Sequence, residues 1–242
     1  MSCLKRLAVV ALLAADAGVA VAADMPGILP PPVLVPPPPI NFNYGWYLRG
    51  DLGYAWGTIG SAQSAPGFAD PTDNKLGNGF VGGVGGGIKT RWLRTDVTLD
   101  YTSPLKYTGS VAAPDDTTAK VAAVTALFNG YLDLGTWYHA TPYIGGGVGA
   151  AQLRVSDYVS AAAPPFVTGL SRTQYNFAWA VMAGVGYAVA PNIVVDAGYR
   201  YVNFGDVTTA SDAFGAMILK NLAAHEVRVG FRWSFDDLPL AH

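Results

Sequence analysis

Residues 225–235 read HEVRVGFRWSF, and their side chains alternate between apolar and polar at every second position. The apolar positions are Val227, Val229, Phe231, Trp233 and Phe235, and the residues between them are charged or small. A period of two is typical of a β-strand that has one apolar and one polar face. This stretch therefore predicts a two-faced strand near the end of the chain.

Seven other segments also read as strands, some of them with the same clear alternation. They are 44–56, 79–89, 93–101, 120–134, 141–154, 175–189 and 193–201. The uncharged run 173–195 is the best helical alternative, but its apolar core, 177–190, is short and contains Gly184 and Gly186. A membrane-spanning helix needs about 20 apolar residues. We therefore expect eight strands.

The connections between these strands alternate in length. Short ones lie at 89–91, 135–140 and 190–192, and long polar ones lie at 58–78, 103–119, 155–174 and 203–221. Outer-membrane barrels have brief periplasmic turns and long extracellular loops. The rhythm predicts an all-β, eight-stranded, antiparallel up-and-down transmembrane β-barrel over residues 44–235, with four long extracellular loops.

The composition fits a membrane protein better than a soluble one. Of the 242 residues, 51% are apolar and only 13% are charged, against roughly 25% charged in ordinary soluble proteins. The net charge of −2 gives no reason to expect a nucleic-acid partner. The single cysteine, Cys3, excludes a disulfide scaffold.

The N-terminus predicts export. Lys5 and Arg6 precede the apolar stretch 7–13, and an Ala-Val-Ala ending follows at 20–22, which is the pattern of a cleaved signal peptide over 1–22. Asp16 weakens the alternative of a retained anchor helix. Residues 23–43 are rich in proline and predict an extended periplasmic spacer, with docking to a partner as the alternative.

A soluble β-sandwich would show the same alternation, but it would have no reason to carry two aromatic belts. Trp46 and Trp56 lie ten residues apart on one face, which spans ~33 Å along a strand and ~25 Å after a tilt of ~40°. That is the height of a lipid-facing band. The topology predicts an outer belt of Trp56, Tyr101, Trp179 and Tyr201 and an inner belt of Trp46, Tyr187, Trp233 and Phe235.

These segments resemble the small opacity-like, or OmpA-like, outer-membrane β-barrel proteins of Gram-negative bacteria. The resemblance rests on HEVRVGFRWSF (225–235), DAGYRYVNFG (196–205), TPYIGGGVG (141–149) and GWYLRGDLGYAWG (45–57). It implies a monomeric barrel in the outer membrane with a structural or surface role; family members are often named porins or surface antigens, sometimes with claims of host adhesion or haem binding. Such barrels usually end on the aromatic residue that the insertion machinery reads, whereas here a tail, 236–242, follows Phe235.

No catalytic, cofactor or metal site is predicted. Residues 77–82 match the dinucleotide fingerprint GxGxxG, but the glycines open a strand and no helix is expected after them. His139 and His242 fall in a turn and in the tail. His225 has Ala223 and Val227 as its neighbours on the same face, and neither is a nucleophile. No two histidines have ligand spacing.

The inward faces of the predicted strands carry charges of both signs. These residues are Arg49, Asp51, Arg94, Asp96, Asp100, Asp133, Asp196, Arg200, Glu226, Arg228 and Arg232. An eight-stranded barrel has room only for side chains, here including the bulky Tyr47, Trp92 and Tyr131. We expect Arg94, Arg200 and Arg232 to pair with carboxylates such as Asp96, Asp196 and Glu226, since unpaired buried charges are costly.

Two functions remain open from the sequence. The first is a surface barrel with a plugged lumen, whose loops meet lipopolysaccharide, a host or a phage. The alternative is a small-pore porin in which the same charges line a narrow ion pathway.

Overall fold

The computed structural model describes residues 44–67, 69–111, 117–160, 170–209 and 216–235, all within one compact unit that spans residues 40–242. The predicted signal peptide (1–22), the Pro-rich segment (23–43) and the tail (236–242) lie outside the described residues. No helix in the described ranges is long and apolar enough to cross a bilayer.

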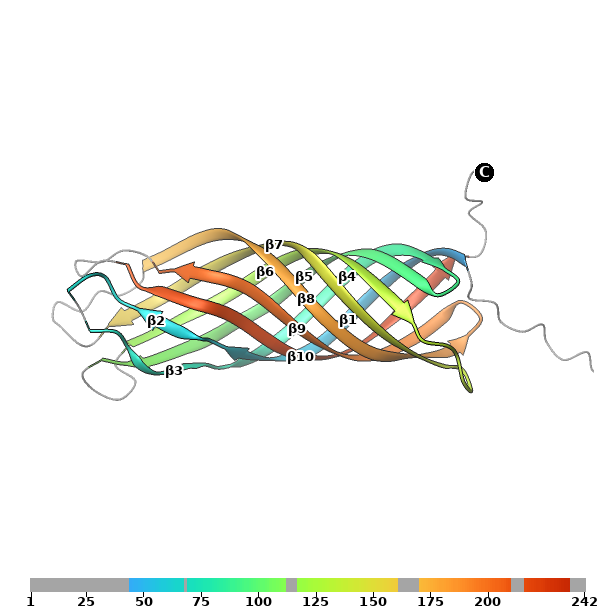
Figure 1. The fold of residues 1–242 in the computed structure, drawn as a ribbon, viewed down its shortest axis with the longest axis horizontal. Helices are drawn as coiled ribbons and strands as arrows, with labels where there is room; N and C mark the ends of the chain where they lie inside the picture. Colours follow the sequence, from blue (N-terminus) through green and yellow to red (C-terminus); the bar gives the residue numbers. More distant parts are fainter. Residues whose placement is uncertain (1–43, 68, 112–116, 161–169, 210–215, 236–242) are drawn as a thin grey trace, which may run out of the picture. The chain divides into compact units, whose positions relative to one another are not determined.

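Within the described residues there are ten β-strands, and eight of them form a closed antiparallel ring (Figure 1). The ring runs β1 (Tyr44–Thr58), β4 (Asn78–Thr90), β5 (Leu93–Ser110), β6 (Thr117–Asp133), β7 (Ala140–Ser160), β8 (Leu170–Ala190), β9 (Ile193–Thr208) and β10 (Ile218–Phe235). Each strand pairs with its neighbours in chain order, and β1 pairs with β10. The predicted fold class is confirmed.

The closing seam between β1 and β10 is long and regular. It runs from Trp46 opposite Phe235 to Thr58 opposite Ala223 without a break in register. The stretch 225–235, whose alternation predicts a strand, belongs to β10, which is one of the two strands of this seam. We call the barrel end with the turns 91–92, 134–139 and 191–192 the turn end, and the opposite end the loop end.

The strands at the loop end are longer than the sequence predicts. β5 continues to Ser110, β7 continues to Ser160 and β8 begins at Leu170, so much of the predicted long loops is regular sheet. Two short strands, β2 (Ser61–Gln63) and β3 (Thr72–Leu76), pair with β10 and β5. Register shifts interrupt the alternation, for example between Thr102 and Leu105, and for this reason the period-two pattern ended too early.

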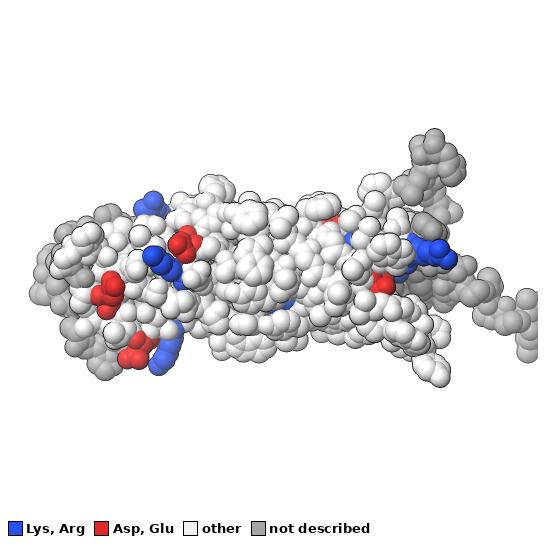
Figure 2. Space-filling view, viewed as in Figure 1, with Lys and Arg blue, Asp and Glu red and all other residues white. Residues whose placement is uncertain are grey.

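The outer surface of the ring is apolar around its middle. Leu52 is 75% exposed, and Leu99, Phe128, Val148 and Val229 are each more than half exposed. On the face that Figure 2 shows, the charged side chains gather toward the two ends and the middle is almost free of them. An exposed apolar band of this kind is stable in lipid rather than in water.

The inner surface has two different halves. At the loop end the inward side chains form an apolar layer, which includes Leu105, Tyr107, Val121, Leu153, Val155, Val202, Phe204, Leu219 and Leu222. The half nearer the turn end contains most of the buried charge. The sequence analysis predicted the charges and did not predict the apolar layer.

Arginine placed on the outward band should destabilise the barrel. Val229→Arg should lower the free energy of unfolding by about 2–4 kcal/mol, because the guanidinium would lie near the middle of the lipid. Leu99→Arg should lower it by less, because Leu99 is only two residues from Tyr101 of the outer belt. The measurement is urea unfolding of the protein refolded into lipid vesicles. The control is Ala69→Arg, since Ala69 is exposed in the connection between β2 and β3. Equal losses in all three variants would contradict the assignment of the outward face.

Candidate functional site

The candidate site is a network of charged side chains inside the barrel. All eleven predicted lumen charges lie at inward, buried or half-buried positions of β1, β5, β6, β9 and β10, and Lys89 of β4 joins them. They form two groups. The central cluster consists of Arg49, Asp51, Asp96, Asp100, Arg200, Glu226 and Arg228, and the turn-end cluster consists of Lys89, Arg94, Asp133, Asp196 and Arg232.

The central cluster is a continuous chain of ion pairs. Arg49 donates to Asp96 at 3.1 Å and to Asp51 at 3.0 Å. Arg228 then contacts Asp51, and it donates to Asp100 at 2.5 Å and to Glu226 at 3.3 Å. Arg200 completes the chain with bonds to Asp100 at 2.8 Å and to Glu226 at 2.7 Å.

Some of these bonds cross the full width of the barrel. Asp100 is on β5 and Arg200 is on β9, and these two strands lie opposite each other in the ring of eight. Gly83 of β4 leaves the space for this crossing, since a Cβ there would overlap the carboxylate of Asp100. The ion pair therefore joins two walls that share no backbone hydrogen bond.

The turn-end cluster contains two sets of ion pairs. Asp133 accepts from Arg94 at 2.8 Å and from Lys89 at 3.0 Å. Arg232 and Asp196 form a bidentate pair, with N···O distances of 2.5 and 3.0 Å. All three arginines named from the sequence pair with inward carboxylates: Arg94 with Asp133, Arg200 with Glu226 and Arg232 with Asp196, while Asp96 pairs with Arg49 in the central cluster.

Tyrosines link the two clusters. The Tyr47 hydroxyl donates to Asp96 at 2.9 Å, and Tyr131 accepts from Arg49 at 2.7 Å. The Arg94 guanidinium lies 4.7 Å from the ring centres of both Tyr131 and Tyr143, a cation–π distance. Tyr47 and Tyr131 are inward residues in the structure.

The prediction that Trp92 points inward is wrong. Trp92 lies in the turn between β4 and β5 and is 59% exposed. The inward alternation of β5 begins two residues later, at Arg94, because the strand starts only at Leu93.

Lys89 is the network residue that the sequence reasoning missed. The sequence places it where the strand 79–89 meets the short connection 89–91 and does not count it among the lumen charges, but it is an inward residue near the end of β4, in line with Gly83, Gly85 and Gly87. The eleven predicted charges comprise five arginines and six carboxylates, so Lys89 brings the network to six positive and six negative groups. Lys89 follows the inward Gly87 by two residues, and this spacing could have predicted that Lys89 also faces inward.

Burial makes this balance of charge important. Glu226 is 0% exposed, Arg94 is 1% exposed and Asp100 is 2% exposed, so each depends on its partners rather than on bulk water. A cavity of about 30 Å³ is lined in part by Arg49, Asp51, Asp100, Asp196, Arg200 and Arg228. A water molecule needs about 10–15 Å³, so this cavity has room for about two waters.

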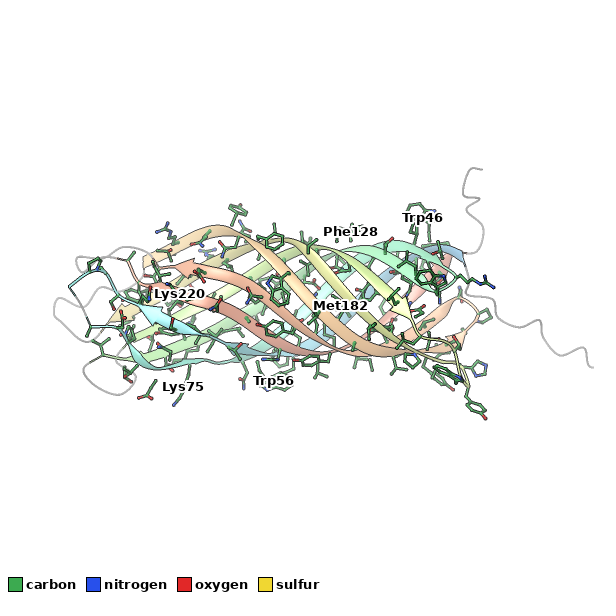
Figure 3. All side chains as sticks on the ribbon, viewed as in Figure 1. Trp46, Trp56, Lys75, Phe128, Met182 and Lys220 are labelled. Atoms are coloured by element: carbon green, nitrogen blue, oxygen red, sulfur yellow. The ribbon has the colours of Figure 1, made fainter. Side chains whose placement is uncertain are left out.

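The eight predicted belt residues lie on the outward face. Trp46, Trp56, Tyr101, Trp179, Tyr187 and Trp233 are exposed, and Tyr201 and Phe235 are partly buried against neighbours. Trp179 packs on Tyr201 and Trp233 packs on Phe235, with ring centres 5.5 and 4.6 Å apart. Figure 3 shows that Trp46 lies near the turn end and Trp56 well short of the loop end, so the strands continue past the outer belt.

The remaining motifs of the sequence have other surroundings. His225 lies on the outward face, with its Nδ1 2.5 Å from the Tyr199 hydroxyl and its ring beside Tyr201. Residues 78–82, the greater part of the GxGxxG match, belong to β4, which pairs with β1 and β5. No group of metal-ligating side chains occurs in the described part of the chain.

Comparison with known proteins places this architecture among bacterial membrane barrels. Residues 38–235 match the family described as outer membrane protein beta-barrel domain. An uncharacterized protein of Brucella suis is 32% identical and aligns over 75% of this chain and 74% of its own length. A putative adhesin of Rickettsia conorii is 24% identical over 78% of this chain and 81% of its own length.

A solved structure shows the same fold. The outer membrane protein OprG from Pseudomonas aeruginosa has a TM-score of 0.53, with 79% of this chain and 96% of OprG covered. The two sequences are 13% identical, so this likeness concerns the fold alone.

Arg200→Ala should destabilise the barrel strongly. The change removes a partner from both Asp100 and Glu226 in a buried site, so the free energy of unfolding should fall by about 3–5 kcal/mol. Arg154→Ala is the matched control, because Arg154 is exposed on the outward face and its loss should cost little. Urea unfolding in lipid vesicles measures both variants.

The double variant Arg200→Met, Glu226→Met tests whether pairing is the cause. It removes both charges together and leaves Asp100 paired with Arg228, so it should be more stable than Arg200→Ala. If Arg200→Ala were as stable as the unaltered protein, the network would have no structural role.

Proposed function

Because the chain belongs to the outer membrane protein β-barrel domain family, we propose that it is a monomeric surface barrel with a plugged lumen, whose loop end binds molecules outside the cell. Barrels of this kind have short turns on the periplasmic side. The loop end then faces outward, and the turn end faces the periplasm.

The crossing ion pairs carry the proposal of a plugged lumen. Arg200 and Asp100 join opposite walls, and the rest of the central cluster surrounds them. The apolar layer, with Leu153, Val155 and Leu222 each at most 1% exposed, lies between this cluster and the loop end. An ion that entered from outside would have to cross both an apolar layer and a network of paired charges.

The length of the strands supports a surface role. The sheet continues beyond the outer aromatic belt to Ser110, Ser160 and Thr208, so the connections at the loop end start from a rigid rim clear of the lipid. The similarity to a putative adhesin of Rickettsia conorii agrees with such a role. Lipopolysaccharide and the surfaces of a host or phage are the partners that this position favours.

The outward face supports two further parts of the proposal. His225 lies among Tyr199 and Tyr201 on the lipid side, which favours contact with the membrane over a catalytic role. Trp233 and Phe235 end the closing strand, and we propose that the barrel insertion machinery reads this aromatic end in spite of the tail that follows.

Planar-bilayer recording tests the plugged lumen. The refolded protein should give no large, steady conductance, because ion pairs and the apolar layer occupy the lumen. A channel-forming porin in the same bilayer is the positive control. Reproducible channels whose ion selectivity changes in Arg49→Ala, without loss of stability, would instead support the porin alternative.

Attachment of bacteria tests the surface role. A non-adherent strain that expresses the protein should attach to host cells more than the same strain with an empty vector. Replacement of residues 161–169, which connect β7 and β8, by a short Gly-Ser turn should reduce this gain while the barrel still forms. No gain on expression would contradict adhesion to host cells.

A further inference from the structure

Three cations lie close together on the outward face above the outer aromatic belt. Lys106 of β5 is directly opposite Lys120 of β6, and Arg154 of β7 is opposite Ala122, two residues from Lys120. All three side chains are exposed. Like charges directly opposite each other on neighbouring strands are destabilising, so this arrangement needs a reason.

The protein neutralises only part of this charge. Asp157 pairs with Lys120 at 2.9 Å, and both side chains are more than half exposed. Three cations and one carboxylate leave a net charge of +2 on this patch. A multivalent anion would stabilise it.

A groove of about 290 Å³ reaches Arg154 and extends from there toward the belt, and Lys120 is two residues along β6 from Ala122 in its wall. Its walls are Tyr101, Ala122, Val124, Gln152, Arg154 and Thr173. Ala122 is smaller than Val124, Gln152 and Arg154 around it, and its small side chain leaves the space of the groove. One end therefore lies beside Tyr101 of the belt, and the other end lies at the Arg154 guanidinium.

The height of the groove matches the surface of the membrane. Tyr101 is opposite Val124, and Lys120 is four residues farther along β6, which is ~13 Å along the strand and ~10 Å along the barrel axis after its tilt. The belt marks the edge of the hydrocarbon, so the cations lie at headgroup level. The apolar wall formed by Tyr101 and Val124 lies at the level of the first acyl carbons.

We propose that this groove binds one phosphorylated glycolipid of the outer leaflet. Its phosphate lies against Lys106, Lys120 and Arg154, and its acyl chain lies against Tyr101 and Val124. Gln152 and Thr173 lie between these two regions, where they face the sugar. The inference rests on the proposed orientation, with the loop end outward.

The apolar wall is the reason to choose a lipid over free phosphate. A soluble anion would contact the cations and leave the groove below them empty. A lipid uses both parts at once, and its acyl chain is already held at this depth by the membrane.

The test compares three probes on the refolded full-length protein in detergent. They are lipid A with two phosphates, the same lipid A without phosphates, and inorganic phosphate. Native mass spectrometry and the shift of the unfolding temperature measure binding. We expect lipid A to bind at least about tenfold more tightly than either other probe, a difference of about 1.4 kcal/mol.

Two variants separate the cations from the groove. Lys106→Gln, Lys120→Gln, Arg154→Gln should weaken lipid A binding at least about tenfold. Ala122→Trp fills the groove without a change of charge and should also weaken it. Lys220→Gln is the control, because it removes a loop-end lysine on β10, on a different part of the ring. Circular dichroism and gel mobility before and after boiling show whether each variant has folded.

Several outcomes would overturn the inference. Undiminished binding by the triple variant would exclude the cations, and equal binding of both forms of lipid A would exclude a phosphate contact. Equal binding of inorganic phosphate, unaffected by Ala122→Trp, would show a soluble-anion site instead. None of these results would change the conductance or attachment measurements, so the proposed function would be judged separately.

Discussion

The constraint that governs this structure is the absence of water in the middle of a bilayer. Every backbone N–H and C=O group of a spanning sheet must find its partner within the protein, so the sheet must close. The seam from Trp46 opposite Phe235 to Thr58 opposite Ala223 provides that closure. Closure with eight strands leaves an interior that only side chains can fill, and any inward charge must then be paired there.

The lumen network satisfies this demand by complete neutralisation. With Lys89 the network has six positive and six negative groups. The ion pairs that cross the lumen, such as Arg200 with Asp100, join strands on opposite sides of the ring. Toward the loop end the same lumen becomes apolar, with Leu153 and Leu219 fully buried. The barrel is thus braced by charge in one half and by close packing in the other, and a stiff support suits a protein that we propose to act through its outer rim.

The sequence predicted the ring because alternation and turn spacing are local properties, and 225–235 displays both faces of its strand. It predicted which charges face inward by the same parity. The sequence did not predict where the strands end at the loop end, because a register shift between Thr102 and Leu105 moves the alternation by one residue. Lys89 and Trp92 were misplaced because the parity at a turn depends on where the next strand starts. Ion-pair partners such as Arg94 and Asp133, which lie on the neighbouring strands β5 and β6, depend on side-chain rotamers, and no local pattern encodes these.

The crossing ion pair also bears on the order in which the barrel assembles. Asp100 and Arg200 are 100 residues apart, and they can meet only after β9 has curled round to face β5. A slip of two residues at the seam would keep every side chain on its proper face, yet it would separate Arg228 from Asp51 and Asp100. Among alignments that keep the faces correct, the native alignment of the final strand is therefore the one in which these buried charges are paired.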